Sequence, residues 1–181
     1  MVHIDIIVEL IESDQLRLNA LACIRLLDLP ECYIAAGFVR NLVWDSLHQK
    51  LEPTTLNDVD VIYFDANESS ADKFIEYERK LTQLLPQLNW QVRNQALMHL
   101  KNNDEPYNSS LDAMSYWPEK ETAVGIRQLS NGGFECIAAF GFDSLFKLQL
   151  THNPKRLKSV FNHRINSKGW LAHWHNLIVV Q

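Results

Sequence analysis

Two aspartates at the start of an apolar strand constrain this chain more than any other feature. Asp58 and Asp60 open the run from Asn57 to Phe64. Side chains of a strand alternate between its faces, so both carboxylates project from one face near the strand's beginning. The opposite face is apolar and Ile62 continues the carboxylate face, which predicts a strand covered on both sides. Two like charges beside such a core are costly unless a cation neutralises them, and Mg²⁺ is a hard cation that carboxylates chelate.

Length and composition are those of a globular domain. The chain has 181 residues, of which 46% are hydrophobic and 22% charged. We expect one domain over residues 1–181, with helical segments at 1–30 and 141–181. The net charge of −5 disfavours binding to nucleic acid or to an anionic membrane. Despite the negative net charge, the sequence contains one basic cluster, which consists of Lys155, Arg156, Lys158, Arg164 and Lys168.

The cysteines and the N-terminus indicate a cytoplasmic protein. Cys23, Cys32 and Cys136 are widely spaced, lie in apolar surroundings and form no Cys-x-x-Cys pair, which predicts buried, reduced thiols. The N-terminus lacks the basic segment of a signal peptide. No apolar run reaches membrane-spanning length. The sequence does not indicate an oligomeric state.

Apolar spacing and turn residues outline an α+β or mixed α/β chain. Strands are predicted over residues 32–36, 58–64 and 90–97. A hairpin is predicted over 122–128 and 134–138, because Asn131-Gly132 accepts positive φ at low cost. Helices are predicted over 6–29 with a break at 13–14, and over 38–47, 71–85, 111–116, 143–150 and 154–168.

Gly37 lies between a predicted strand and a predicted helix. Unpaired backbone N–H groups and the positive end of the helix dipole would lie beside it, where a phosphate could bind. Arg40, on the first turn, could reach that phosphate, and Asn41 could support the turn. Many such turns carry a glycine only for its backbone freedom. If the strand before Gly37 neighbours the strand of Asp58 and Asp60, a triphosphate at the turn would meet metal ions held by the aspartates.

These motifs resemble the nucleotidyltransferase superfamily that includes DNA polymerase β and the CCA-adding enzymes. The resemblance rests on residues 34–41, Trp44-Asp45, His48 and residues 57–60. A more specific resemblance, to a little-characterised bacterial nucleotidyltransferase-like family, extends to the end of the chain. It continues through Asn94-Gln95-Ala96, Trp117-Pro118-Glu119, residues 139–143 and Lys168-Gly169-Trp170, and covers nearly everything after Tyr33.

The resemblance implies a fold, a substrate and a site. The fold would be the polymerase β-like α+β fold, a mixed sheet flanked by helices. Asp58 and Asp60 would bind Mg²⁺ or Mn²⁺, and Gly37, Arg40 and Asn41 would bind the phosphates of an NTP.

The chain departs from the superfamily pattern at two points. A Gly-Gly or Gly-Ser pair is usual at the turn, but Phe38 follows Gly37, so a hydroxyl is missing. A third carboxylate is usual on a later strand, yet residues 90–95 contain none. Asp112 and Glu135 are the remaining candidates, and we carry Asp112 as a catalytic candidate although it could simply cap a helix with Ser109.

The function expected from the sequence is therefore metal-dependent transfer of an NMP group from an NTP to an unidentified acceptor. The alternative is a non-catalytic member of the same fold that binds a nucleotide or a protein partner.

Overall fold

The computed structural model describes residues 2–70 and 72–180. Its elements follow in the order α1 (Val2–Glu12), α2 (Gln15–Arg25), β1 (Tyr33–Ala35), α3 (Gly37–Leu47), β2 (Val59–Tyr63), α4 (Lys73–Leu84), β3 (Trp90–Asn94), α5 (Gln95–Asn102), α6 (Ser110–Met114), the 3₁₀ helix η1 (Lys120–Thr122), β4 (Val124–Gln128), β5 (Phe134–Ala138), α7 (Asp143–Phe146), β6 (Gln149–Thr151), α8 (Lys158–Lys168), α9 (Trp170–His173) and β7 (Ile178–Val180).

A five-stranded mixed sheet forms the centre of the molecule, in the order β3-β2-β1-β4-β5. β2 and β3 are parallel, and the other neighbouring pairs are antiparallel. The register places Ala35 at the end of β1 directly opposite Asp60 in β2. The predicted neighbourhood of these two strands is confirmed, and it brings the turn at Gly37 beside the aspartates.

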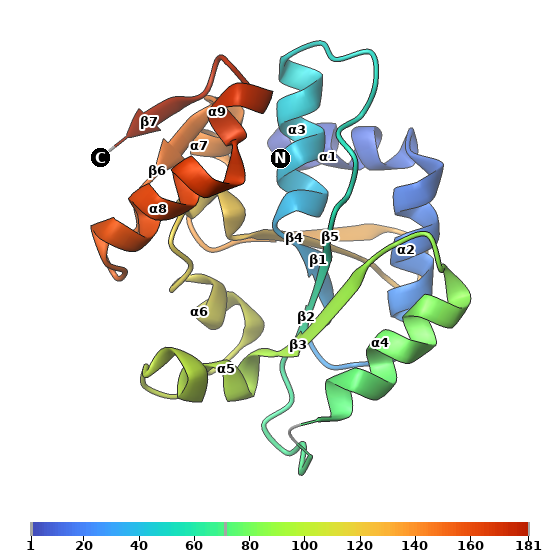
Figure 1. Ribbon diagram of the computed structural model, residues 1–181. Helices are drawn as coiled ribbons and strands as arrows, with labels where there is room; N and C mark the ends of the chain where they lie inside the picture. The colour runs from blue at the N-terminus through green and yellow to red at the C-terminus, as the bar shows by residue number, and fades with distance from the viewer. Residues whose placement is uncertain (1, 71, 181) are drawn as a thin grey trace.

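Helices cover the two faces of this sheet unequally. Figure 1 shows α2 and α4 on one side and α5 and α6 on the other. The larger hydrophobic core lies with α2, α3 and α4 and contains Val59, Val61 and Tyr63 of β2. Ile62 belongs to a smaller cluster on the opposite face, with Ala35 and Met114. Because Asp60 shares that face with Ile62, the carboxylates lie where the helical cover is thinner.

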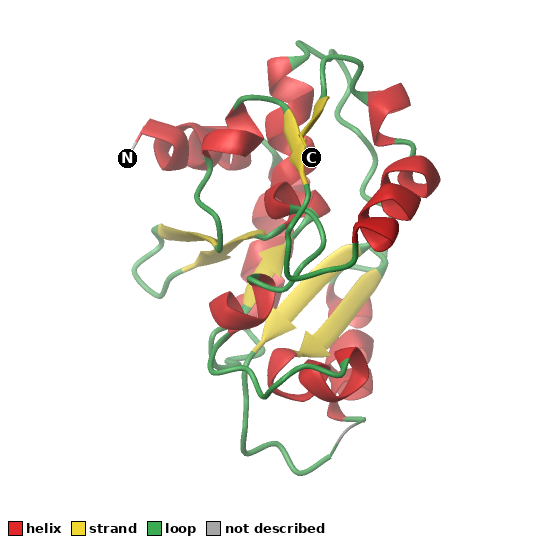
Figure 2. Cartoon of the chain, turned by 90° about the vertical axis from the view of Figure 1, so that its left-hand side faces the viewer, coloured by secondary structure: helices red, strands yellow, loops and turns green. Residues whose placement is uncertain are grey.

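The C-terminal part of the chain is less helical than predicted. Helix α7 ends at Phe146, and β6 pairs in parallel with β7 in a separate two-stranded sheet, seen apart from the main sheet in Figure 2. Leu148 adopts a positive φ of 54°, which ends the helical path between the two elements. The helix expected over 143–150 is therefore too long, and the segment 141–181, which was expected to be helical, contains two short strands beside its helices.

Other predictions are confirmed or corrected at their boundaries. The hairpin forms as β4 and β5, and the break near Ser13 separates α1 from α2. The strand predicted over 90–97 stops at Asn94, whose side-chain oxygen accepts a hydrogen bond from the backbone N–H of Ala96 and caps α5. Ala71, the predicted start of α4, lies outside the described residues.

The predictions about thiols and membrane segments can also be compared with the structure. Cys23, Cys32 and Cys136 are free, and Cys32 is buried. None of the helices within residues 2–70 and 72–180 combines the length and apolar character needed to cross a bilayer.

Candidate active site

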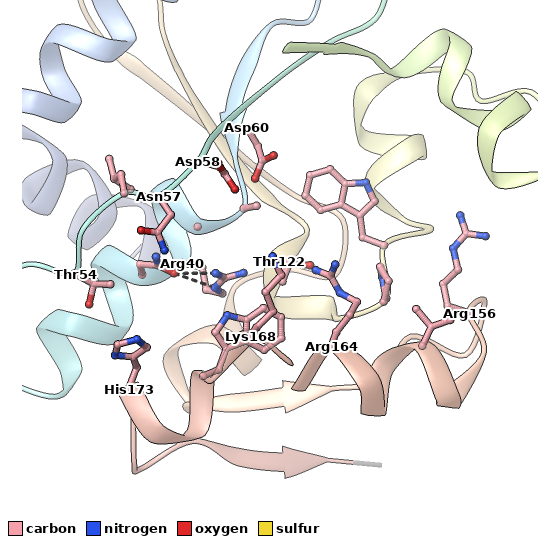
Figure 3. Close-up of a pocket in the computed structure, with 18 of the residues that line it drawn as sticks. Arg40, Thr54, Asn57, Asp58, Asp60, Thr122, Arg156, Arg164, Lys168 and His173 are labelled. Atoms are coloured by element: carbon pink, nitrogen blue, oxygen red, sulfur yellow. Dashed lines mark hydrogen bonds between the residues drawn. The ribbon is translucent and has the colours of Figure 1, made fainter. Parts of the chain in front are cut away.

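A pocket of about 760 Å³ opens between the head of β2, the first turn of α3 and the C-terminal helix α8. Figure 3 shows Asp58 and Asp60 on one side of it, with Arg40, Arg164 and Lys168 across from them. These five side chains come from segments that lie far apart in the sequence. The fold therefore opposes an acidic wall to a basic wall.

The two carboxylates of the acidic wall, Asp58 and Asp60, differ in their hydrogen bonds. Asp58 is exposed and accepts a hydrogen bond from Asn89 Nδ2 at 2.5 Å. Asp60 is half-buried, and no side-chain hydrogen bond or ion pair reaches its carboxylate from residues 2–70 or 72–180. Burial raises the pKa of Asp60, against the lowering effect of Arg40, and the charge of Asp58 raises it further. A carboxylate in this state favours an external cation.

The basic wall follows one face of α8. Val160, Arg164 and Lys168 follow one another at four-residue intervals along α8, and all three line the pocket. Arg156, four residues before Val160 in the preceding loop, lines it as well. Four-residue spacing places side chains above one another on one helix face. Arg156 is held by a two-pronged contact with Asp104, whose carboxylate accepts from Nη1 at 2.7 Å and from Nη2 at 2.5 Å.

Arg40 adds a buried positive charge at the foot of the basic wall. Its side chain is 6% exposed. The guanidinium donates from Nε and Nη2 to Oδ1 of Asn41, at 3.2 and 2.9 Å. It stacks over the rings of Trp44 and Trp170, at 5.1 and 4.8 Å from their centroids. Burial lowers the pKa of Arg40 to about 10, so the group is charged at neutral pH.

The turn into α3 is strained at Ala36. This residue has φ 54° and ψ −120°, a conformation that favours glycine. Its N–H donates to Val124 O at 2.9 Å, and its carbonyl accepts from Arg40 N at 2.9 Å, so β4 and α3 both fix it. Beside it, a Cβ added to Gly37 would lie 3.4 Å from Arg40 Nη2 and from Asn41 Nδ2. The turn is thus packed closely against the groups expected to bind phosphate.

Asp45 holds the rim of the pocket in place. Its carboxylate accepts from Thr54 N and Thr54 Oγ1, both at 2.7 Å, and from Trp174 Nε1 at 2.8 Å. Lys50 Nζ lies 3.4 Å from the same carboxylate. These contacts tie the loop before β2 and the C-terminal segment to α3. Both segments line the pocket.

Comparison with known proteins identifies the family. A family model described as nucleotidyltransferase matches residues 22–179. The chain belongs to this nucleotidyltransferase family.

A solved structure supports the same family and its fold. It is an NMR structure described as revealing a CCA-adding enzyme head domain, and it is 33% identical in sequence with a TM-score of 0.84. The match covers 97% of this chain and 94% of the other. A search of curated proteins finds no match. The expected polymerase β-type nucleotidyltransferase fold is confirmed.

The structure brings most of the predicted site residues together. Asp58, Asp60, Gly37, Arg40 and Asn41 all line the one pocket. Their individual roles stay predictions.

The two candidates for a third carboxylate lie elsewhere. The Asp112 side chain accepts hydrogen bonds from Asn108, and its backbone N–H is capped by Ser109 Oγ at 2.9 Å. Glu135 pairs with Arg127 and accepts a hydrogen bond from the Tyr33 hydroxyl. Neither lines the pocket, so the structure does not bring Asp112 to the site expected of a catalytic residue.

Both departures from the family pattern have a structural explanation. Phe38 is fully buried in the main core, so a hydroxyl at this position would not face the pocket. Beside Asp60, the paired position on β3 is Gln91, which accepts a hydrogen bond from Arg93. Among the residues that the structure describes, no three His, Cys, Asp or Glu side chains are arranged to hold a metal.

The sequence alone did not predict that the basic cluster lines the pocket, and it indicated Glu119 only as part of the motif Trp117-Pro118-Glu119. Arg164 and Lys168 were recognised only as part of a cluster, although their spacing of four already places them on one helix face. Glu119 is fully buried and pairs with Arg164 at 2.6 Å. No local pattern signals that contact, since 45 residues separate the partners.

Proposed function

We propose that this nucleotidyltransferase moves a nucleotidyl group from an NTP to an acceptor, using a divalent cation held by Asp58 and Asp60. The observation that carries the proposal is the unpartnered Asp60 carboxylate facing a row of basic side chains across the pocket. A cation on the acidic wall and a triphosphate on the basic wall would satisfy both at once. The likeness to a CCA-adding enzyme head domain supports this reading.

The donor set fits Mg²⁺ bound together with a substrate. Mg²⁺ commonly takes one or two protein carboxylates and completes its shell with water and substrate phosphates. Asp58 and Asp60 supply that number and no more within the described residues. When bound, such cations activate the acceptor and stabilise the leaving pyrophosphate.

The protein's own groups position the triphosphate and neutralise its charge. Arg40 and the backbone N–H groups at the start of α3 lie at the Gly37 turn, where the 11-residue helix presents its positive end. The charges of Arg164 and Lys168 act to lower the pKa of Asp60, against the larger effect of burial, which raises it. Little covalent chemistry falls to these side chains, because positioning and charge neutralisation supply most of the rate in such transfers.

Trp117 offers a surface for the nucleobase. Its indole is half-buried and lines the pocket, whereas Trp170 and Trp174 are buried in the core. Stacking of a base on an aromatic ring contributes about 1–3 kcal/mol. Trp117→Ala is expected to raise the KM for the NTP about tenfold, and Trp117→Phe to restore most of the affinity. A KM unchanged in Trp117→Ala would remove the base from this position.

The test of the function is incubation with each labelled NTP and Mg²⁺ or Mn²⁺ in the presence of candidate acceptors. The expected result is label transfer with pyrophosphate release, reduced at least about a hundredfold in Asp58→Asn/Asp60→Asn. Asp112→Asn is the matched control and should keep full activity, since its side chain faces Asn108. Turnover that persists in the double variant would refute the catalytic assignment.

A non-catalytic, nucleotide-binding function is the competing candidate. The observation in its favour is that neither Asp112 nor Glu135 joins the aspartate pair. It predicts Mg²⁺-dependent NTP binding without turnover for every NTP and acceptor tried.

A further inference from the structure

Glu119 is a fully buried carboxylate directly behind the basic wall. Its side chain is 0% exposed, and Arg164 Nε donates to its Oε1 at 2.6 Å. The hydroxyl of Thr122 donates to the Glu119 backbone carbonyl at 2.8 Å, and the same hydroxyl oxygen lies 3.3 Å from Oε2. Burial and the bond to Arg164 therefore hold the carboxylate in place. A buried carboxylate held this firmly restricts the orientation of the arginine bound to it.

The contact with Glu119 leaves the outer part of the Arg164 guanidinium available. Arg164 lines the pocket and stacks over Trp170, with 5.8 Å from Cζ to the ring centroid. Nε is bonded to Glu119, and the terminal nitrogens make no hydrogen bond to any residue in 2–70 or 72–180. A guanidinium fixed at Nε and stacked on a ring presents its remaining donors in a defined direction, which suits two-pronged binding of a phosphate.

Glu119 also balances two neighbouring positive charges. Arg40 and Arg164 both stack on Trp170, at 4.8 and 5.8 Å. Burial lowers the pKa of Arg40 most, the negative charge of Glu119 is the largest influence opposing this, and the charge of Arg164 lowers it further. Glu119 thus offsets the mutual repulsion of the two arginines before any ligand binds.

We propose that Glu119 is a positioning residue of the triphosphate site, which acts by holding Arg164 toward the pocket and by balancing the paired arginines. The proposal rests on the proposed function, because it assigns the basic wall to phosphate groups. Glu119 therefore serves an arginine, whereas the aspartate pair serves the cation. Glu119 itself does not line the pocket.

A double-mutant cycle tests the proposal, with inorganic tripolyphosphate in EDTA as the probe. Dissociation constants are measured for the wild type, Glu119→Gln, Arg164→Ala and the double variant. Arg164→Ala is expected to weaken binding about tenfold or more, and Glu119→Gln about fivefold, since bonds to charged groups are the stronger ones. In the Arg164→Ala background, Glu119→Gln should have a much smaller effect, because only its interaction with the charge of Arg40 remains.

Glu121→Gln is the matched control. Glu121 is also a buried carboxylate, but it accepts a hydrogen bond from Thr151 N at 2.8 Å and does not contact Arg164. Any effect of this variant on tripolyphosphate binding should be the same with and without Arg164. A Glu119→Gln effect of equal size in both backgrounds would show a general structural role and overturn the proposal.

Two further results separate this proposal from the proposed function. Arg164→Lys keeps the positive charge but loses the fork of guanidinium donors, so this variant should bind tripolyphosphate several-fold more weakly. Wild-type affinity in Arg164→Lys would overturn the proposal. This test remains available even if Glu119→Gln does not fold. Coupling between residues 119 and 164 without any NTP turnover would uphold the positioning role and refute nucleotidyl transfer. Absence of tripolyphosphate binding by the wild type would overturn the positioning role.

Discussion

Two aspartates that lie near opposite ends of α3 are in opposite situations: Asp45 belongs to the helix itself, and Asp60 belongs to β2. At the C-terminal end, Asp45 is buried and accepts hydrogen bonds from Thr54 and Trp174. At the N-terminal end, Asp60 packs beside the strained turn at Ala36 and receives no such bond from the described residues. The first carboxylate is completed by the protein. The second receives no such bond from residues 2–70 and 72–180, as the proposed cation site requires.

The largest loss of stability is expected from substitution of Asp45, near the C-terminal end of α3. Asp45→Ala leaves the buried N–H of Trp174 and the partly buried donors of Thr54 without their acceptor, which should lower the free energy of unfolding by about 3 kcal/mol. Urea denaturation measures this value. Asp143→Ala is the control, because that carboxylate is 79% exposed and should change stability by less than about 0.5 kcal/mol. Equal effects of the two variants would show that Asp45 stabilises the fold no more than an exposed carboxylate does.

Substitution of Asp60 should raise the stability of the folded protein, whereas substitution of Asp45 should lower it. Burial raises the pKa of Asp60, so the folded state keeps the proton to a higher pH than the unfolded chain does. Stability therefore falls as the pH rises from the ordinary carboxyl range through the raised pKa. Asp60→Asn removes this loss.

Thermal melts in EDTA between pH 3.5 and 7.5 test that response. Asp60→Asn should melt a few degrees above the wild type at neutral pH, and the difference should disappear toward acidic pH. Asp58→Asn, at the exposed carboxylate, is the comparator and should show a smaller change. An Asp60→Asn variant that is less stable than the wild type at pH 7 would contradict the account.

The smallest expected effect concerns the strained turn. Relief of the left-handed conformation at Ala36 favours glycine by about 1–2 kcal/mol, and the greater freedom of glycine in the unfolded chain offsets about 0.5–1 kcal/mol of this. Ala36→Gly should therefore stabilise the protein by up to about 1 kcal/mol in urea denaturation. Ala35→Gly, in the neighbouring strand, is the control and should destabilise it. A destabilised Ala36→Gly variant would show that the turn carries no strain.

The sequence predicted the part of this site that depends on short-range pattern. Period-two alternation places Asp58 and Asp60 on one face, and a glycine before a helix marks the turn at Gly37. The opposing wall was not predicted, because the contact of Arg164 with Glu119 spans 45 residues and depends on how α8 packs against the sheet. Asp112 was a catalytic candidate because the family resemblance implies a third carboxylate, and the alternative, a helix cap with Ser109, is the one that the structure shows.

The parts of the fold that differ from prediction are short and depend on local backbone detail. β6 and β7 have three residues each, too few to establish a strand period, and their pairing joins segments near residues 150 and 179. Leu148 has no intrinsic preference for its positive φ, and its carbonyl accepts a hydrogen bond from the distant Ile178 N at 2.8 Å. Long periodic elements such as α3 were placed within one residue.

The most direct test of the proposed cation site at Asp58 and Asp60 is the Mg²⁺ dependence of NTP affinity in the wild type and in Asp58→Asn/Asp60→Asn. If the aspartate pair holds a cation opposite the triphosphate, Mg²⁺ should tighten NTP binding by the wild type about tenfold or more. In EDTA the double variant should bind the NTP more tightly than the wild type, because two negative charges facing the phosphates are gone, and Mg²⁺ should add little. Equal Mg²⁺ dependence in both proteins would contradict the account.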